Sequence, residues 1–398
     1  MKKIYLLLLV ACMQLQLNAQ VRYLDEVFSS VSVDSNVSYG FNFNVYSIGQ
    51  ELNMDIYTPD GDSLAARPLV ILAHGGSFIG GDRKLPDIVS IATALAKRGY
   101  VTASIQYRLG VNVLSGNPLI IEFTNAVWRA VQDGRAAVRY FRKDAATANA
   151  YKIDTSNIYF GGISAGGVLG LHLAYFDRPS ELSGITVDTS LLGGFDGNSG
   201  NPGYSWRVKG VVNLCGAIGN VNWLYDNNKV AICNVHGDQD QTVPYGSNDF
   251  YYAGLKVGYL QGSYSVDSAA RLNGMYSQLK TFVGQDHVPF SSNAQYMDTT
   301  IKYSAEFLYN MVQGNIRAGV QMAGTENRIP VYPNPANSML NLELQRGETY
   351  LVTDLTGKRI AEGTALQTQT QLDVSEWNNG VYVLHTAGSR AVRIVVQH

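Results

Sequence analysis

Ser164 lies in the segment Gly162-Ile163-Ser164-Ala165-Gly166, which directly follows an apolar run and precedes a helix-like segment. A sharp strand-to-helix turn leaves no room for a Cβ two positions either side of its central residue, so glycine at both places has a steric cause. The turn exposes the serine Oγ, and the helix N-terminus favours negative charge there. The segment therefore predicts a nucleophilic serine.

A serine nucleophile needs a base, and the base needs an acid that orients it. Among the six histidines, His287 is the one on a loop after the last strand of the predicted central sheet, so we expect it to be the base. Asp240, beside a Val-Pro turn, is the expected acid. Asp238 and Asp286 remain rival acids.

The segment His74-Gly75-Gly76-Ser77 directly follows another apolar run. Consecutive glycines after a strand let backbone N–H groups turn towards one point, as an oxyanion hole requires. Considered alone, the segment is equally compatible with an inert glycine-rich loop. Together with Ser164 it favours acyl-transfer chemistry.

Strand-like and helix-like segments alternate through the middle of the chain. Several of the strand-like segments are continuous apolar runs, which is typical of parallel strands covered on both faces. We therefore predict an α/β fold with a doubly wound, mostly parallel sheet and a site at the carboxyl ends of its strands. The expected strands are 37–45, 51–57, 69–73, 101–106, 158–162, 208–215, 230–235 and 279–283, and the expected helices are 86–98, 123–142, 166–176, 268–278 and 295–312.

Composition limits the classes of partner. The 398 residues are 46% hydrophobic and 16% charged, and 30 Lys and Arg against 32 Asp and Glu leave a formal charge of −2. Such a balance argues against nucleic-acid binding by phosphate neutralisation. Forty Gly and 25 Tyr with 11 Pro exclude a disordered, collagenous or coiled-coil chain. Cys215 and Cys233 fall in what look like neighbouring strands, where either a disulfide or two inert thiols would fit.

Both ends of the chain differ from its middle. Residues 1–19 have a charged start, an apolar run and a small residue before the expected cleavage point, so they predict a signal peptide. An alternative is a lipoprotein box that ends at Cys12. No later apolar run is long enough to span a membrane. Short alternating segments follow a linker at 315–328 and predict a small all-β sandwich at 329–398, with a hairpin turn at 378–380.

Residues 35–312 resemble α/β-hydrolases of the carboxylesterase/lipase type. The motifs that carry the resemblance are His74-Gly75-Gly76, Gly162-x-Ser164-x-Gly166-Gly167, His236-Gly237-x-x-Asp240-x-x-Val243-Pro244 and His287. It implies a catalytic domain at 20–314 with Ser164 as nucleophile, Asp240 as acid and His287 as base. The oxyanion donors would be the backbone N–H groups of Gly76, Ser77 and Ala165. Many relatives have a third glycine in place of Ser77, so a positive φ there would strain the loop. Because the expected acid is an aspartate, the resemblance is to the hormone-sensitive-lipase-like or feruloyl-esterase-like branches of this family.

Residues 329–398 resemble the C-terminal sorting domain of the Bacteroidetes type IX secretion system. The resemblance rests on Tyr332-Pro333-Asn334-Pro335 at the start and Gly380-Val381-Tyr382-Val383-Leu384 near the end. It implies export, handling by the type IX translocon and its sorting protease, and release or attachment at the outer-membrane surface. Arg390 and Arg393 stand where the family usually carries lysine. A carbohydrate-binding or adhesive sandwich is the alternative.

The sequence therefore predicts a secreted serine esterase that needs no metal or organic cofactor. Acyl or feruloyl esters on polysaccharides are candidate substrates, because tyrosines at 251, 252, 259 and 264 follow the acid; tyrosines that serve only packing are the alternative. Two other functions remain open. One is a serine peptidase of the dipeptidyl-peptidase type, and the other is a catalytically dead hydrolase fold used for surface adhesion.

Overall fold

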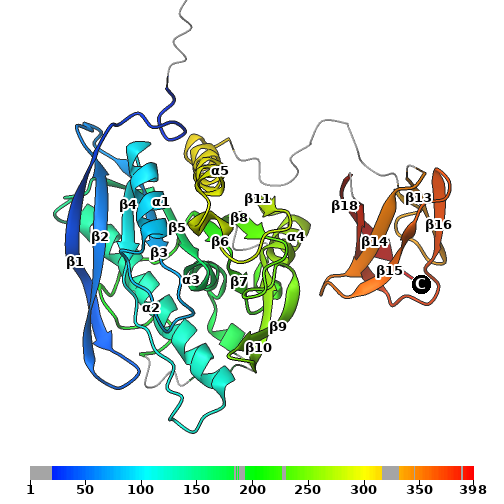
Figure 1. Cartoon of the computed structure of the whole chain (residues 1–398), viewed down its shortest axis with the longest axis horizontal. Helices are drawn as coiled ribbons and strands as arrows, with labels where there is room; N and C mark the ends of the chain where they lie inside the picture. Colours follow the sequence, from blue (N-terminus) through cyan, green and yellow to red (C-terminus); the bar gives the residue numbers. More distant parts are fainter. Residues whose placement is uncertain are drawn as a thin grey trace, which may run out of the picture.

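The computed structural model describes residues 20–182, 185, 187, 193–225, 230–315, 331–344, 346–386 and 389–398. The predicted signal peptide at 1–19, with its alternative at Cys12, lies outside the described residues. So does the predicted linker apart from residue 315. Figure 1 shows a large α/β unit and a small all-β unit.

An eight-stranded sheet forms the centre of the α/β unit. Its order is β1-β2-β4-β3-β5-β6-β8-β11, antiparallel between β1, β2 and β4 and parallel from β4 to β11. The predicted mostly parallel, doubly wound sheet is therefore confirmed. The strands are β1 (Val31–Phe43), β2 (Gly49–Pro59), β3 (Arg67–Ala73), β4 (Val101–Ile105), β5 (Ile153–Ile163), β6 (Gly210–Leu214), β8 (Ala231–Gly237) and β11 (Ser277–Phe282).

Helices cover both faces of this sheet (Figure 1). Alternate residues of β3 enter two different cores, because successive side chains of a strand point to opposite faces. Leu69 and Ile71 pack with the apolar sides of α2 (Leu119–Ala146), α3 (Ala165–Tyr175) and α4 (Ser263–Leu272). Val70 and Leu72 pack with α1 (Pro86–Lys97) and α5 (Ala294–Gln313). The helix predicted at 268–278 is misplaced, since α4 begins and ends earlier.

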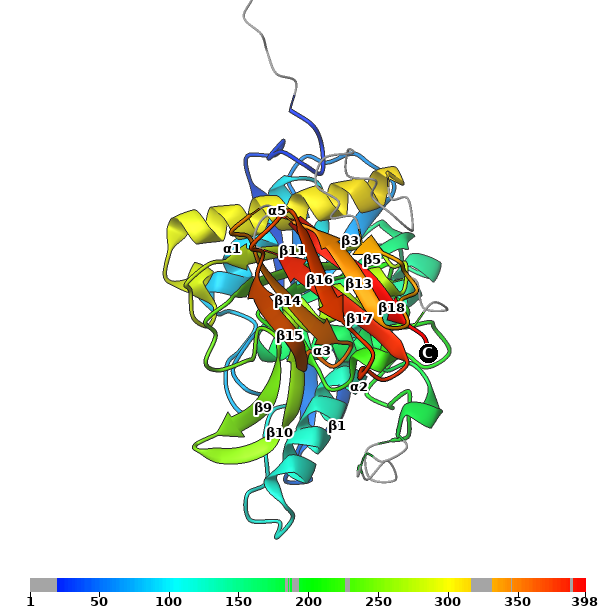
Figure 2. The same ribbon diagram turned by 90° about the vertical axis from the view of Figure 1, so that its right-hand side faces the viewer.

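A second, three-stranded sheet was not predicted. It contains β7 (Ala217–Ile218), β10 (Leu255–Gly262) and β9 (Ser247–Tyr252), and β9 and β10 form an antiparallel hairpin. The described residues of the unit also form three 3₁₀ turns: η1 (Pro179–Leu182), η2 (Val221–Trp223) and η3 (Pro289–Ser291). In both views the β9–β10 hairpin extends away from the main sheet beside the N-terminal end of α2 (Figures 1 and 2).

The C-terminal unit is a sandwich of two antiparallel sheets around its own apolar core. The turn at 378–380 was predicted to close a hairpin, and this is wrong: β16 pairs with β13, whereas β17 pairs with β14 and β18, so the turn links the two sheets. The strands are β12 (Val331–Tyr332), β13 (Met339–Glu343), β14 (Thr349–Asp354), β15 (Arg359–Thr364), β16 (Gln369–Asp373), β17 (Gly380–Thr386) and β18 (Ser389–Val396). Among the described residues, no helix has the length and apolarity to cross a membrane.

Candidate active site

Ser164 stands on the turn between β5 and α3 with φ of 54° and ψ of −115°. This is the strained conformation that the glycine spacing predicted. A Cβ on Gly162 would lie 2.4 Å from the backbone of Gly166, and a Cβ on Gly166 would lie 2.0 Å from the carbonyl oxygen of Ala73. The backbone N–H of Ser164 donates to the carbonyl of Leu214 at 2.7 Å, which fixes the turn to β6.

A continuous line of hydrogen bonds connects Ser164, His287 and Asp240. The Nε2 of His287 lies 2.8 Å from Ser164 Oγ, and its Nδ1 lies 2.6 Å from Asp240 Oδ2. His287 follows β11 and Asp240 follows β8, so both reach the site from the carboxyl edge of the sheet. Val288, directly after the base, has φ of 49°. With Pro289 behind it, this left-handed residue restricts the backbone that carries the imidazole.

Asp240 is the carboxylate that contacts the ring of His287, and its side chain is fully buried. Burial alone would raise the pKa of the Asp240 carboxyl. Hydrogen bonds from His236 and His287 outweigh burial and hold that pKa below its ordinary value. The other carboxylate oxygen accepts from the backbone N–H groups of Thr242 and Val243, both at 2.8 Å. Asp240 is thus held as an anion beside the imidazole.

The two rival acids bond to backbone instead. Asp238 accepts from the N–H of Gly284 at 2.6 Å. Asp286 accepts from the N–H groups of Gln241 and His287 at 2.8 and 2.7 Å. Each carboxylate therefore fastens the acid loop to the base loop.

The loop after β3 lies against the serine turn. A Cβ on Gly75 would lie 3.4 Å from Ser164 Cβ, and Gly76 has φ of 117°. Ser77 has φ of 54°, so this position does adopt the left-handed conformation that glycine favours, with a serine in place. Among the described residues, the backbone N–H groups of Gly76, Ser77 and Ala165 have no hydrogen-bond acceptor.

A cavity of about 730 Å³ opens beside Ser164 between α2, α3 and β10. Its lining is mainly apolar and aromatic, and the polar groups are few, as in most small-molecule sites. His172 on α3 faces the cavity, and burial lowers its pKa to about 4, so the ring is neutral at physiological pH. The main lining side chains are Phe78, Ile120, Phe123, Val127, Trp128, Val168, Phe176, Trp223, Phe250, Val257, Tyr259 and Leu260.

Two family profiles match the chain. Residues 54–229 match BD-FAE, which is of the esterase type with the α/β-hydrolase fold, and residues 330–397 match a secretion system C-terminal sorting domain. The protein is a carboxylic ester hydrolase with a BD-FAE domain. Its sorting domain is of the type IX class, so the esterase is exported and is either secreted or attached to the cell surface.

Solved structures resemble the esterase at low sequence identity, and no curated protein matches it. A truncated carbohydrate esterase from gut microbiota is 20% identical over 73% of this chain and 98% of its own, with a TM-score of 0.50. An esterase of the planctomycete Thermogutta terrifontis with propionate bound is 18% identical over 71% and 95%, with a TM-score of 0.47. The likeness to the first shows a shared fold.

The β9–β10 hairpin is the part of the esterase's cavity wall that sequence reasoning missed. Phe250 and Tyr259 line the cavity, whereas Tyr251 is 56% exposed. Phe123 on α2 packs against Phe250, with ring centroids 6.0 Å apart. Tyr264 points elsewhere, since its hydroxyl contacts His385 of the sorting domain. The tyrosine cluster therefore divides into cavity lining, exposed surface and a contact between the domains.

Polar side chains of α2 bind part of the long insertion that lies between α3 and β6. Gln132, Arg135 and Arg139 donate to backbone carbonyls of residues 194–200. The guanidinium of Arg135 also lies 4.0 Å from the ring centroid of Trp206. The described residues 178, 180, 181, 185 and 187 of the insertion line the cavity. The α2 contacts thus hold residues 194–200 of the insertion against the helix.

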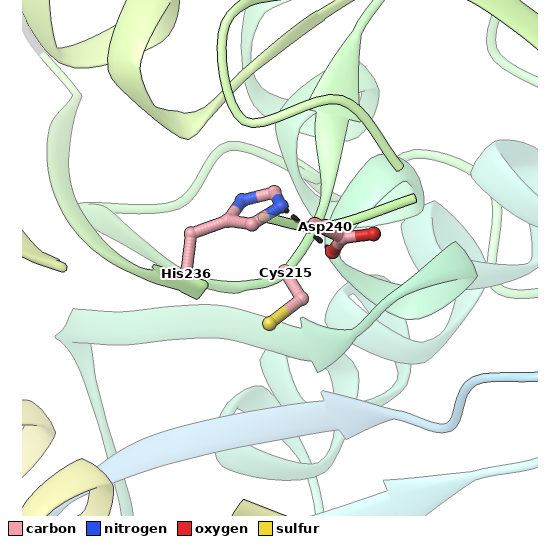
Figure 3. A group of neighbouring side chains, drawn as sticks. All are labelled: Cys215, His236 and Asp240. Atoms are coloured by element: carbon pink, nitrogen blue, oxygen red, sulfur yellow. Dashed lines mark hydrogen bonds and ion pairs between the residues drawn. The ribbon is translucent and has the colours of Figure 1, made fainter. Parts of the chain in front are cut away.

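Cys215, His236 and Asp240 come close enough together that their ligand atoms lie within 4.8 Å of one another (Figure 3). A metal does not suit this cluster. Burial raises the pKa of the Cys215 thiol to about 12, so the sulfur keeps its proton, and both Asp240 oxygens already accept hydrogen bonds. Cys233 lies on β8, whereas Cys215 directly follows the neighbouring β6, which ends one residue before the predicted strand 208–215 does; both are free thiols.

Proposed function

We propose that Ser164, His287 and Asp240 are the catalytic triad of this esterase. The observation that carries the proposal is the hydrogen-bond line from Ser164 Oγ through His287 to Asp240, at 2.8 and 2.6 Å. Ser164 attacks the ester carbonyl while His287 takes the hydroxyl proton and then gives it to the leaving alcohol. Water, activated by the same imidazole, cleaves the acyl-enzyme.

The oxyanion in this mechanism is held by the backbone N–H groups of Gly76, Ser77 and Ala165. Support comes from the position of the Gly75–Gly76 loop against Ser164 and from the place of Ala165 at the first position of α3. Donors fixed before the reaction need no reorganisation as charge develops, which is why such sites are effective.

The substrate class we propose is acyl or feruloyl esters on polysaccharides. The BD-FAE match and the sorting domain suit an exported enzyme that acts on material outside the cell. A cavity of about 730 Å³ is larger than an acetyl group needs, and its aromatic lining suits a ring or a longer chain. The domains we propose are a signal peptide at 1–19, a catalytic domain at 20–314, a linker at 315–328 and a sorting domain at 329–398. The partners would be the type IX translocon and its sorting protease.

Substitution of Ser164 tests the triad directly. Ser164→Ala should abolish hydrolysis of p-nitrophenyl acetate and labelling by a fluorophosphonate probe, while circular dichroism stays that of the wild type. Retained turnover would refute the triad. A panel of acetyl-xylan, feruloyl-arabinose, long-chain glyceryl and dipeptidyl substrates then tests the substrate class, and a preference for the dipeptide or the glyceride would overturn it.

A further inference from the structure

His236 binds the same carboxylate oxygen as the proposed base. Its Nε2 lies 3.0 Å from Asp240 Oδ2 (Figure 3). The same oxygen also accepts from His287 at 2.6 Å. His236 is fully buried at the end of β8. The triad mechanism makes no use of this second histidine.

The neighbours of His236 assign its proton. Nε2 faces two acceptors, Asp240 Oδ2 and the carbonyl of Val243 at 3.1 Å, so this nitrogen carries hydrogen. Nδ1 lies 2.7 Å from Ser263 Oγ. That hydroxyl accepts from Asn213 Nδ2 at 3.0 Å, which directs its own hydrogen to Nδ1. The surroundings therefore fit an imidazole that donates from Nε2 and accepts at Nδ1.

Ser263 belongs to a longer buried network that fixes this arrangement. Asn213 on β6 also donates to Asn234 on β8 at 2.9 Å. At the far end, Ser277 on β11 donates to Asp267 on α4 at 2.6 Å, and Asn234 Nδ2 lies 3.4 Å from Ser277 Oγ. Three strands and one helix thus hold the imidazole of His236.

Among the residues that the structure describes, few titratable groups face the imidazole of His236 from the elements that pack against it. Asp240 follows β8, the strand that carries His236, and Cys215 directly follows β6. Tyr245 packs edge-on against the imidazole, with 5.7 Å between the ring centroids. From α4, Asp267 is neutralised by Arg271 at 2.7 Å. The residue opposite on β11 is Thr281, which does not titrate in this range. Asp240 is therefore the one anion bonded to this imidazole among the described residues.

We propose that His236 is a positioning residue, whose Nε2–H holds Asp240 in one rotamer and weakens the attraction of Oδ2 for the proton on His287. The inference rests on the proposed triad. A donor on Oδ2 draws electron density from the oxygen that faces the base. Without this second donor, the carboxylate of Asp240 would attract that proton more strongly.

Four variants test this inference. In His236→Leu the acidic limb of the kcat/KM profile for p-nitrophenyl acetate should move up by about half to one pH unit, and kcat should fall by roughly 10-fold because Asp240 is less restrained. Ser263→Ala frees the Nδ1 of His236 and should move the limb in the same direction by less. His236→Gln keeps an N–H within reach of Oδ2 and should restore most of both properties.

Ser265→Ala is the matched control, because Ser265 is on the same helix but its hydroxyl bonds to Ser247 at 2.7 Å. It should leave the pH profile unchanged. If His236→Leu does not fold, Ser263→Ala decides, with thermal melting as the check on folding. Acidic limbs that coincide with the wild type in every folded variant would overturn the inference. Activity retained in Ser164→Ala would instead refute the triad itself.

Discussion

The carboxylate of Asp286 accepts a hydrogen bond from the backbone N–H of Gln241 at 2.8 Å. The loop that carries His287 is thereby tied to the loop that carries Asp240. Asp238 makes the reciprocal connection, since it accepts from the N–H of Gly284. Asp238 and Asp286, which look like rivals of Asp240 in the sequence, thus connect the two loops by hydrogen bonds.

The three acids should respond differently to the same substitution. Asp240→Asn should lower kcat by about 10³- to 10⁴-fold, because the amide can no longer stabilise an imidazolium and favours the wrong tautomer. Asp238→Asn and Asp286→Asn keep an acceptor oxygen, so each should cost less than about 10-fold. The measurement is kcat on p-nitrophenyl acetate at pH 8. A loss in Asp286→Asn as large as that in Asp240→Asn would reassign the acid.

The glycine loop should tolerate a substitution at Ser77 but not at Gly76. A Cβ on Gly76 would lie 2.1 Å from the carbonyl oxygen of Gly80, so Gly76→Ala must displace the loop. We expect a loss in kcat of about 100-fold or more, the size associated with losing an oxyanion donor. Ser77 already has a positive φ, and Ser77→Gly should keep kcat within a few-fold. Equal losses in both variants would argue against this account of the loop.

Sequence patterning predicted the main sheet because its strands are continuous apolar runs between glycine turns. It missed β9 and β10, whose residues are mostly half-buried or exposed and show no comparable run. Their turn is Ala253-Gly254, both with positive φ, and alanine is not a residue that signals such a turn. The predicted hairpin at 378–380 was wrong for the opposite reason: good turn residues do not specify which sheet the next strand joins.

The sequence likewise predicted part of the site and missed part of it. Motif order was enough to bring Ser164, Asp240 and His287 together, because strand ends of a parallel sheet meet at one edge. The second histidine on Asp240 was not anticipated, since His236 looked like a strand residue. The spacing of His236 and Asp240 across one tight turn was the available signal. The bonds through Ser263 and Asn213 depend on side-chain packing between elements that are distant in sequence.

Neither Cys215 nor Cys233 should react in the folded esterase. Burial raises the pKa of both Cys215 and Cys233 to about 12, so at pH 8 almost no thiolate is present, and both side chains are inaccessible. A thiol reagent such as dithionitrobenzoate should label less than about 0.1 equivalent at pH 8 and both thiols after unfolding in guanidinium. Failure to label after unfolding under non-reducing conditions would reveal a disulfide.

His172 should make the esterase sensitive to mild acid. The ring bonds to the carbonyl of Val168 and accepts from the N–H of Gly219, and its pKa in the folded protein is about 4 against 6.5 ordinarily. Between these values the unfolded chain binds a proton that the folded chain does not. The stabilisation is therefore complete above about pH 6.5 and is lost as the pH falls towards 4. The free energy of unfolding, measured with urea, should fall less between pH 7 and pH 5 in His172→Gln than in the wild type. An equal fall in the two proteins would contradict this.

The gap between β10 and α2 should set the length of acyl group that the esterase accepts. A Cβ on Gly258 would face Ile120 with its nearest atom at 3.7 Å, and both residues line the cavity. Gly258→Val should narrow this gap. Its Cβ would meet no atom closer than 3.7 Å, Gly258 is outside the left-handed region, and a β-branched residue suits a strand.

The variant should raise KM for p-nitrophenyl decanoate by roughly 10-fold and change KM for p-nitrophenyl acetate by less than about twofold, because the short acyl group stays near Ser164. Ile120→Ala widens the same gap and should change the ratio of the two KM values in the opposite direction. If both variants keep the wild-type ratio, the acyl chain lies in another part of the cavity.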